Sequence, residues 1–124
     1  MLPAQHRLTE RGELTATVRG PGARRQGSRL LVVHARHTDA RSALPPRVGV
    51  VVSKAVGNAV ARNRVKRRLR AQVAPLLPAV PPGTDLVLRA NPAAAGATSA
   101  QIGEALARAI GSLTAEIAPA GAGR

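Results

Sequence analysis

The spacing of apolar and polar positions along the chain predicts a mixture of strands and helices. Three apolar runs rich in β-branched residues predict strands at 29–35, 47–53 and 84–90. The run at 47–53 has no polar alternation, which is typical of a strand covered on both faces. A last helix is expected with Thr98 or Ser99 as its candidate N-cap, because apolar residues at helical spacing follow: Ile102, Leu106, Ile110, Leu113 and Ile117.

Glycine and proline mark the ends of the other elements. Gly20-Pro21-Gly22 ends a weak helix expected within residues 1–20, whose apolar positions are Leu8, Leu14 and Val18. Residues 21–28 and 37–46 are expected to be loops, the first basic and the second ending in two prolines.

A central helix is predicted from about residue 58 to residue 74, with Asn58 as the candidate N-cap and Pro75 as its limit. At about 100° per residue, one buried stripe should contain Ala61, Val65, Leu69, Gln72, Val73 and Leu76. Together with the strands before and after it, this helix forms a βαβ unit, which implies a parallel strand pair and, by the general rule, a right-handed crossover.

These elements predict one α+β domain over residues 1–117, with the order α-β-β-(β)-α-β-α and a disordered tail at 118–124. The parentheses allow for one further short strand in the loops. A chain of 124 residues is long enough for a single modest core. It contains no Cys, no apolar run of membrane-spanning length and no signal-peptide pattern near the start, so a cytoplasmic location is expected.

The charge balance points to a polyanionic partner. Nineteen Lys and Arg residues against six Asp and Glu give a net charge of +13, which favours nucleic acid. The chain has no Phe, Trp or Tyr, so only His or Arg is available to stack on bases.

Six of the cations fall within nine residues, "RNRVKRRLR" at 62–70. On the predicted helix they occupy every direction except the buried stripe, and no acidic residue lies between Asp39 and Asp85. A solvated helix face usually mixes the two signs, so we expect this surface to bind phosphates. Asn63 either contacts a base edge or a 2′-hydroxyl, or is a neutral spacer.

The sequence gives no support for a self-contained active site. His6, His34 and His37 lack metal-ligand spacing, and no two carboxylates lie close in the sequence. The glycines at 20–22 do not form a phosphate-binding loop. We therefore expect neither a catalytic residue nor a metal ligand in this chain.

The stretch "RVGVVVSKAVGNAVARNRVKRRLR" at 47–70 closely resembles the bacterial ribonuclease P protein component. The matching residues are Ser53-Lys54, Gly57-Asn58-Ala59-Val60, Arg62-Asn63-Arg64, Lys66-Arg67 and Arg70. Weaker matches at 6–24 and 85–94 extend the resemblance over most of residues 6–115.

The resemblance implies a protein subunit that helps a catalytic RNA remove the 5′ leader of precursor tRNA. Mg²⁺ would be held mainly by the RNA subunit and the substrate, and neither a membrane nor an obligate protein partner is expected. The implied fold is a two-layer α/β sandwich whose crossover is left-handed, against the general rule. The implied RNA contacts are Lys54, Asn58, Arg62, Asn63, Arg64, Lys66, Arg67, Arg68 and Arg70.

The resemblance also places the leader in a cleft between the first helix and the sheet. Members of the family usually present aromatic residues there, whereas this chain has Leu14 and Val18 on the helix and His34 on the strand. We therefore expect Arg contacts and apolar packing with weak base preference, unless Leu14 and Val18 belong to the core. The alternative functions are a structural RNA-binding protein, such as a ribosomal protein, and an architectural DNA-binding protein. The second lacks helix-turn-helix spacing and an apolar wedge.

Overall fold

A four-stranded sheet forms the centre of the computed structural model, which describes residues 11–38 and 44–117. The sheet order is β1-β2-β4-β3, with antiparallel β1–β2 and β2–β4 pairs and a parallel β3–β4 pair. The strands are β1 (Arg24–Gly27), β2 (Leu31–His37), β3 (Arg47–Val51) and β4 (Thr84–Ala90). The tail at 118–124 and the position of Leu8 lie outside the described residues.

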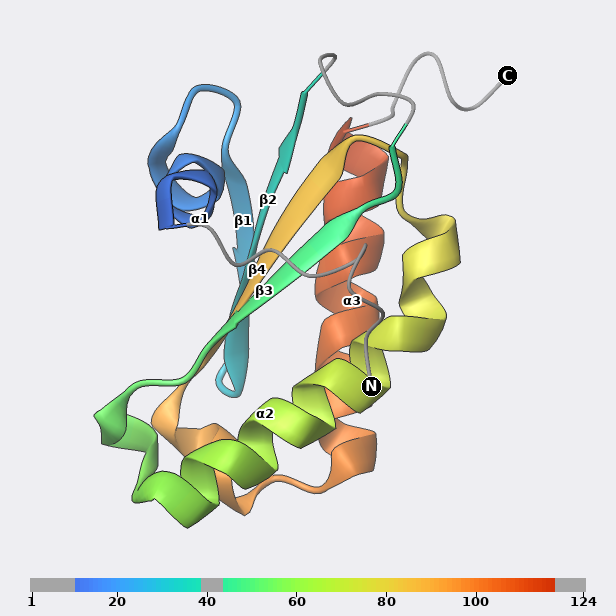
Figure 1. Ribbon diagram of the computed structural model, residues 1–124. Coiled ribbons are helices and arrows are strands. Elements are labelled where there is room, and N and C mark those ends of the chain that lie inside the picture. Colours follow the sequence, from blue (N-terminus) through green and yellow to red (C-terminus); the bar gives the residue numbers. More distant parts are fainter. Residues whose placement is uncertain (1–10, 39–43, 118–124) are drawn as a thin grey trace.

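Helices pack on both faces of the sheet, as Figure 1 shows. The long helices α2 (Ala59–Val73) and α3 (Ser99–Ile117) form a layer on one face, and the short helix α1 (Arg11–Arg19) lies on the other. Three 3₁₀ segments complete the described chain: η3 (Lys54–Val56), η4 (Ala74–Ala79) and η5 (Pro92–Gly96). The predicted α+β class and the order α-β-β-β-α-β-α are confirmed.

The core lies between the sheet and the α2–α3 layer. Alternate residues of each strand face this layer, and those of the two central strands are almost fully buried: Leu31, Val33, Ala35, Leu86, Leu88 and Ala90. The helices contribute the predicted stripes. Ile102, Leu106, Ile110 and Leu113 of α3 are buried, while Ile117 is half-buried.

Two expectations at the start of the sheet were wrong. Residues 24–27 form the edge strand β1 rather than a loop, because they pair with residues 32–35 of β2. The following strand begins at Leu31 instead of residue 29, since Ser28 to Leu30 make the turn between the two strands. In that turn the Ser28 N–H donates to the Leu31 carbonyl at 2.8 Å.

The expectation for the apolar run at 47–53 was also wrong. Strand β3 is at the edge of the sheet and is not covered on both faces, because the Val51 side chain remains 39% exposed. The other face of β3 packs on the core, where Val48 is buried and Val50 is partly buried. The βαβ prediction is confirmed, since β3 and β4 are parallel with α2 between them in the sequence.

The stripe of α2 departs from the prediction at its end. Val65, Leu69 and Val73 are buried as expected, but Leu77 rather than Leu76 continues the stripe. The chain tightens into 3₁₀ geometry at η4, which turns each residue by about 120° instead of about 100°. A helical projection at constant pitch therefore fails after Val73.

Candidate nucleic-acid interface

Helix α2 begins at a well-defined N-terminal cap. The Asn58 Oδ1 atom accepts a hydrogen bond from the Ala61 N–H at 2.9 Å, which confirms Asn58 as the N-cap. The preceding residue, Gly57, has φ +152°, and a Cβ there would lie 2.9 Å from the Ala61 Cβ. Glycine at this position therefore allows the chain to turn from η3 into the helix.

The α2 surface opposite the core is covered by unneutralised positive charge. Arg64, Arg67 and Arg70 are exposed, as is Asn63 between them. Lys54 in η3 and the cap Asn58 are also exposed, whereas Arg62 and Lys66 are half-buried. Within the described part of the chain, none of the cations of this group forms an ion pair. The fold thus presents a row of guanidinium and ammonium groups without internal counter-ions.

Arg68 differs from its neighbours because it has a partner within the protein. Its Nη1 atom donates to the Ala97 carbonyl at 2.6 Å, and Ala97 is buried. This bond ties α2 to the segment just before α3. Arg62 is different again, because its Nε atom is buried and has no hydrogen-bond partner among the described residues.

Close packing against α3 fixes the direction of α2. A Cβ added to Gly103 of α3 would lie 2.5 Å from the Gln72 Oε1 atom. Gln72 was predicted to lie on the buried stripe and is half-buried there, as is Ala61. The helix is therefore held along its length by the core, by Arg68 and by the Gln72 contact, while Arg64, Arg67 and Arg70 remain exposed.

The predicted cleft residues lie on the α1 side of the sheet. Leu14 and Val18 are both half-buried on α1, and Thr17 between them is almost fully buried. His34 of β2 alternates with the core residues Val33 and Ala35, so its side chain faces away from α2 and α3. At 4% exposure, His34 presents no open ring face for stacking.

Burial decides the electrostatics of His34. Desolvation lowers the pKa of its imidazole below the usual 6.5, and the positive charges of Arg25 and Arg89 lower it further. Neither ring nitrogen has a hydrogen-bond partner among the described residues. His34 is therefore neutral at pH 7 and behaves largely as an apolar residue at this site.

Sequence reasoning missed the two arginines that flank His34. Arg25 lies directly opposite His34 across the β1–β2 pair, and Arg89 lies opposite the neighbouring Val32 across β2–β4. Both are exposed. Residues 21–28 were expected to form a loop, so the alternation of a strand was not applied to them and Arg25 was not assigned to a face of the sheet.

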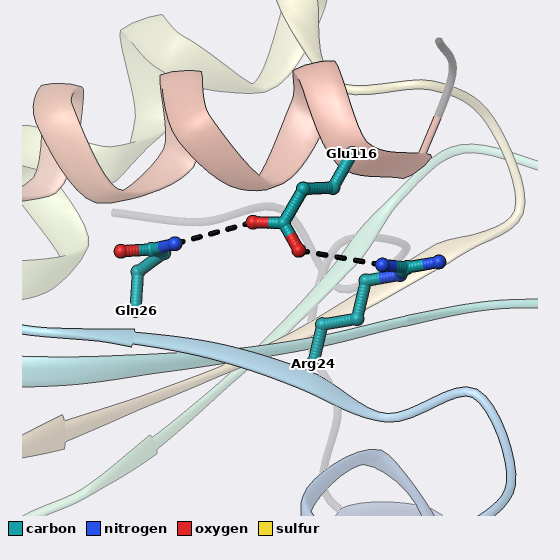
Figure 2. Close-up of polar contacts among 3 residues, drawn as sticks. All are labelled: Arg24, Gln26 and Glu116. Carbon is teal, nitrogen blue, oxygen red and sulfur yellow. Dashed lines mark hydrogen bonds and ion pairs between the residues drawn. The ribbon is translucent and has the colours of Figure 1, made fainter. Parts of the chain in front are cut away.

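The neighbours of Arg25 face the other side of the sheet. Figure 2 shows Arg24 and Gln26 reaching toward α3, where the Glu116 carboxylate accepts hydrogen bonds from both. The distances are 3.3 Å from Arg24 Nη1 and 3.1 Å from Gln26 Nε2. These contacts hold β1 against α3 and leave Arg25 on the α1 side.

Two further arginines on the α1 side of the sheet have partners within the protein. Arg47 donates from Nε and Nη2 to the two carboxylate oxygens of Asp85, each at 2.9 Å. The Arg36 Nε atom donates to the Pro21 carbonyl at 3.0 Å. These side chains hold the strands and the α1–β1 turn, so Arg25 and Arg89 are the stronger candidates for an external anion.

Neither a metal cluster nor a membrane span is found within residues 11–38 and 44–117. No group of three or more His, Cys, Asp or Glu side chains lies close enough there to hold a metal ion. No helix of that part is both long and apolar enough to cross a bilayer.

Comparison with known proteins identifies close relatives. A family model described as Ribonuclease P matches residues 2–114. The ribonuclease P protein component of Streptomyces bikiniensis is 50% identical over 108 residues, covering 82% of this chain and 86% of that protein. That of Beutenbergia cavernae is 53% identical over 102 residues, covering 82% of each.

Solved structures of lower identity share the fold. The RNase P protein of Staphylococcus aureus superimposes with a TM-score of 0.72 at 24% identity, covering 91% of this chain and 94% of that chain. The RNase P protein of Thermotoga maritima gives a TM-score of 0.68 at 22% identity, covering 82% and 92%. The element order and the sheet described above are therefore those of a known fold.

Proposed function

Because the chain belongs to the ribonuclease P protein family, whose members are subunits of a tRNA-processing endoribonuclease, we propose that it is the accessory protein of that enzyme. It binds the catalytic RNA through α2 and the 5′ leader of precursor tRNA across the α1 face of the sheet. Its task is to assist endonucleolytic removal of the leader, which gives the mature 5′ end.

The unneutralised cations of α2 carry the proposal. Like charges at i,i+4 destabilise a helix by about 0.2–0.5 kcal/mol per pair, and Lys66–Arg70 is such a pair. An RNA that places phosphates around α2 removes this repulsion and releases its own counter-ions. Since α2 is fixed by its cap, by the core and by the Arg68 bond, its cations are held in place before RNA arrives.

The α1 face suits a leader recognised through its backbone. Stacking on an aromatic side chain contributes about 1–3 kcal/mol per base in other single-strand binders, and this chain has no Phe, Trp or Tyr. Arg25 and Arg89 instead offer exposed guanidinium groups for phosphates, beside the half-buried Leu14 and Val18. Leader binding should therefore depend weakly on base identity.

We assign the chemistry to the RNA subunit. The described residues do not fit a Mg²⁺ site, because their carboxylates are few and Asp85 and Glu116 are already paired with Arg47 and Arg24. Mg²⁺ in the proposal belongs to the RNA and the substrate, and no step is routed through the protein. The partners are the catalytic RNA and precursor tRNA in the cytoplasm, with neither a membrane nor an obligate protein partner.

Cleavage of a precursor tRNA by the cognate catalytic RNA tests the proposal. The assay is run at low Mg²⁺, with and without this protein, and with the protein alone. We expect the protein to restore cleavage at the mature 5′ end and to be inert by itself. If the protein binds the RNA but leaves cleavage unchanged, it is a structural RNA-binding protein. Equal affinity for duplex DNA in competition at fixed salt would contradict both functions.

A further inference from the structure

A groove of about 840 Å³ lies on the side of the sheet opposite to α1. Its walls are α3, the 3₁₀ segment η5 and the turn between β1 and β2. A volume of this size falls within the roughly 300–1,000 Å³ of typical ligand sites. Neither the α2 surface nor the α1 face described above includes this groove.

The lining of the groove combines apolar residues with two arginines from different elements. Leu30, Ala105 and Ala109 are half-buried in it and leave the space open. Arg29 extends from the β1–β2 turn and Arg108 from α3. Two guanidinium groups from different elements, together with apolar lining residues, suit a phosphodiester strand whose bases or sugars pack against the apolar part.

Both arginines are available to an external anion. Among the described residues, the Arg29 guanidinium has no hydrogen bond and no ion pair. The Arg108 Nη2 atom lies 3.8 Å from the Glu104 carboxylate, but the two side chains are 84% and 72% exposed. An exposed pair of this kind contributes little, so a phosphate can replace Glu104 as the partner of Arg108.

The groove adjoins α2 at Ala97. Ala97 lines the groove, and its carbonyl accepts the bond from Arg68 of α2. Arg64 lies one helical turn before Arg68, on the same side of α2. Ala97 therefore lies between the α2 cations on this side and the groove.

We propose that the groove binds a single-stranded segment of the RNA subunit, with phosphates on Arg29 and Arg108. This inference rests on the proposed function, since it takes α2 as the main site of the same RNA. We commit to the RNA subunit rather than the leader, because the proposed leader surface is on the opposite face of the sheet. RNA would then contact the protein on both sides of η5.

The test measures the affinity of the protein for the cognate RNA subunit, without substrate, as a function of salt. Replacing both cations, Arg29→Ala with Arg108→Ala, should make the negative slope of log K against log salt shallower by about 1.4, at about 0.7 per single-strand phosphate. The affinity ratio of wild type to variant should then fall about sevenfold between about 50 and about 200 mM salt. Both side chains are exposed, so the melting temperature should stay unchanged.

A matched pair of charge insertions on α3 provides a second measurement. Ser112 lines the groove, whereas Ala107 is an exposed α3 residue that does not. Ser112→Glu should weaken RNA binding clearly more than Ala107→Glu, although the two variants have the same net charge. Equal effects would show that only the total charge matters, which would overturn the proposal.

The outcomes separate this inference from the proposed function. If Arg67→Ala lowers the salt slope while the Arg29/Arg108 double variant does not, α2 remains an RNA site and the groove proposal is wrong. If the double variant impairs leader-bearing precursor tRNA more than leaderless tRNA, with RNA-subunit binding unchanged, the occupant is the leader and the proposal is overturned. If the wild-type protein fails to prefer the RNA subunit over duplex DNA, both proposals fall together.

Discussion

Replacing Arg67 by alanine should remove one phosphate contact of α2 and leave the fold intact. Arg67 is exposed and forms no ion pair within the described part of the chain. If it neutralises one phosphate of a helical RNA, the negative slope of log K against log salt should become shallower by about 0.9, the value for duplex DNA. The affinity ratio of wild type to variant should therefore decrease about 3.5-fold as salt rises from about 50 to about 200 mM.

The assay is filter binding of the purified RNA subunit at four or more salt concentrations, accompanied by thermal unfolding of the free protein. A surface substitution without partners changes the free energy of unfolding by no more than about 0.5 kcal/mol. We therefore expect the melting temperature of the Arg67→Ala variant to match that of the wild type. A lower melting temperature with an unchanged salt slope would refute the reasoning, because it would assign Arg67 to the fold.

Arg68→Ala is the matched contrast, one residue along the same helix. It removes a charge-assisted hydrogen bond of 2.6 Å and leaves the carbonyl of the buried Ala97 without this donor. Hydrogen bonds to charged groups contribute about 1.5–3 kcal/mol, so the free protein should lose stability on that order. The two variants carry the same net charge, so a melting-temperature difference between them isolates the Arg68 bond.

Three other substitutions give sharp expectations. Because the pKa of His34 is lowered in the folded protein, the unfolded chain binds the proton more readily, and the free energy of unfolding should fall as pH drops through about 6.5 toward the folded pKa. In denaturant titrations, His34→Leu should reduce this pH dependence. An unchanged pH dependence would show that another group causes it. Leu14→Ala should reduce cleavage of leader-bearing precursor tRNA by a larger factor than it reduces binding of leaderless tRNA. Losses by the same factor, together with a lower melting temperature, would place Leu14 in the core. Gly111→Ala should raise the free energy of unfolding by about 0.5–1 kcal/mol, because glycine destabilises a helix interior relative to alanine and α3 has open space for a Cβ there. Chemical denaturation that shows no gain in stability would contradict this prediction.

The elements with strong periodicity could be predicted from the sequence almost to the residue. Strand 84–90 matches β4, and four of the five predicted stripe positions of α3 are buried, because each pattern reflects direct contact with the core. Thr98 was one of two candidate caps, and its Oγ1 atom accepts from the Gln101 N–H at 3.1 Å. Such local signals need no knowledge of the rest of the chain.

The errors occurred where the structure depends on distant partners. Strand β1 has only polar residues and glycine, and it exists because β2 supplies its hydrogen bonds and Glu116 of α3 anchors Arg24 and Gln26. Nothing in the local pattern of residues 24–27 indicates this pairing. Neither the position of Arg25 nor the groove could be predicted for the same reason, since both depend on where β1 lies.

The residues of the candidate site also divide into those that a local pattern predicts and those whose contacts depend on distant partners. The α2 cations could be read from the sequence because they follow one helical pattern, and the structure holds most of them outward as expected. The internal bond of Arg68 could not be predicted, because its acceptor is 29 residues away in the sequence. His34 was placed on the correct strand, but its burial depends on α1, which no single-strand pattern reveals.

The described surface offers many guanidinium groups and few groups that read bases. Contacts to phosphates set position and orientation, whereas base edges carry sequence information. Asn63 is exposed amid the α2 cations, but the other α2 contacts in the proposal are donors suited to phosphate. With no aromatic side chain and with His34 buried, the α1 face likewise lacks a stacking platform. Under the proposed function, such a subunit would bind RNA by shape and charge, which suits an enzyme that must accept leaders of different sequence. The same proposal assigns recognition of the cleavage point to the RNA subunit, and affinity and alignment to the protein.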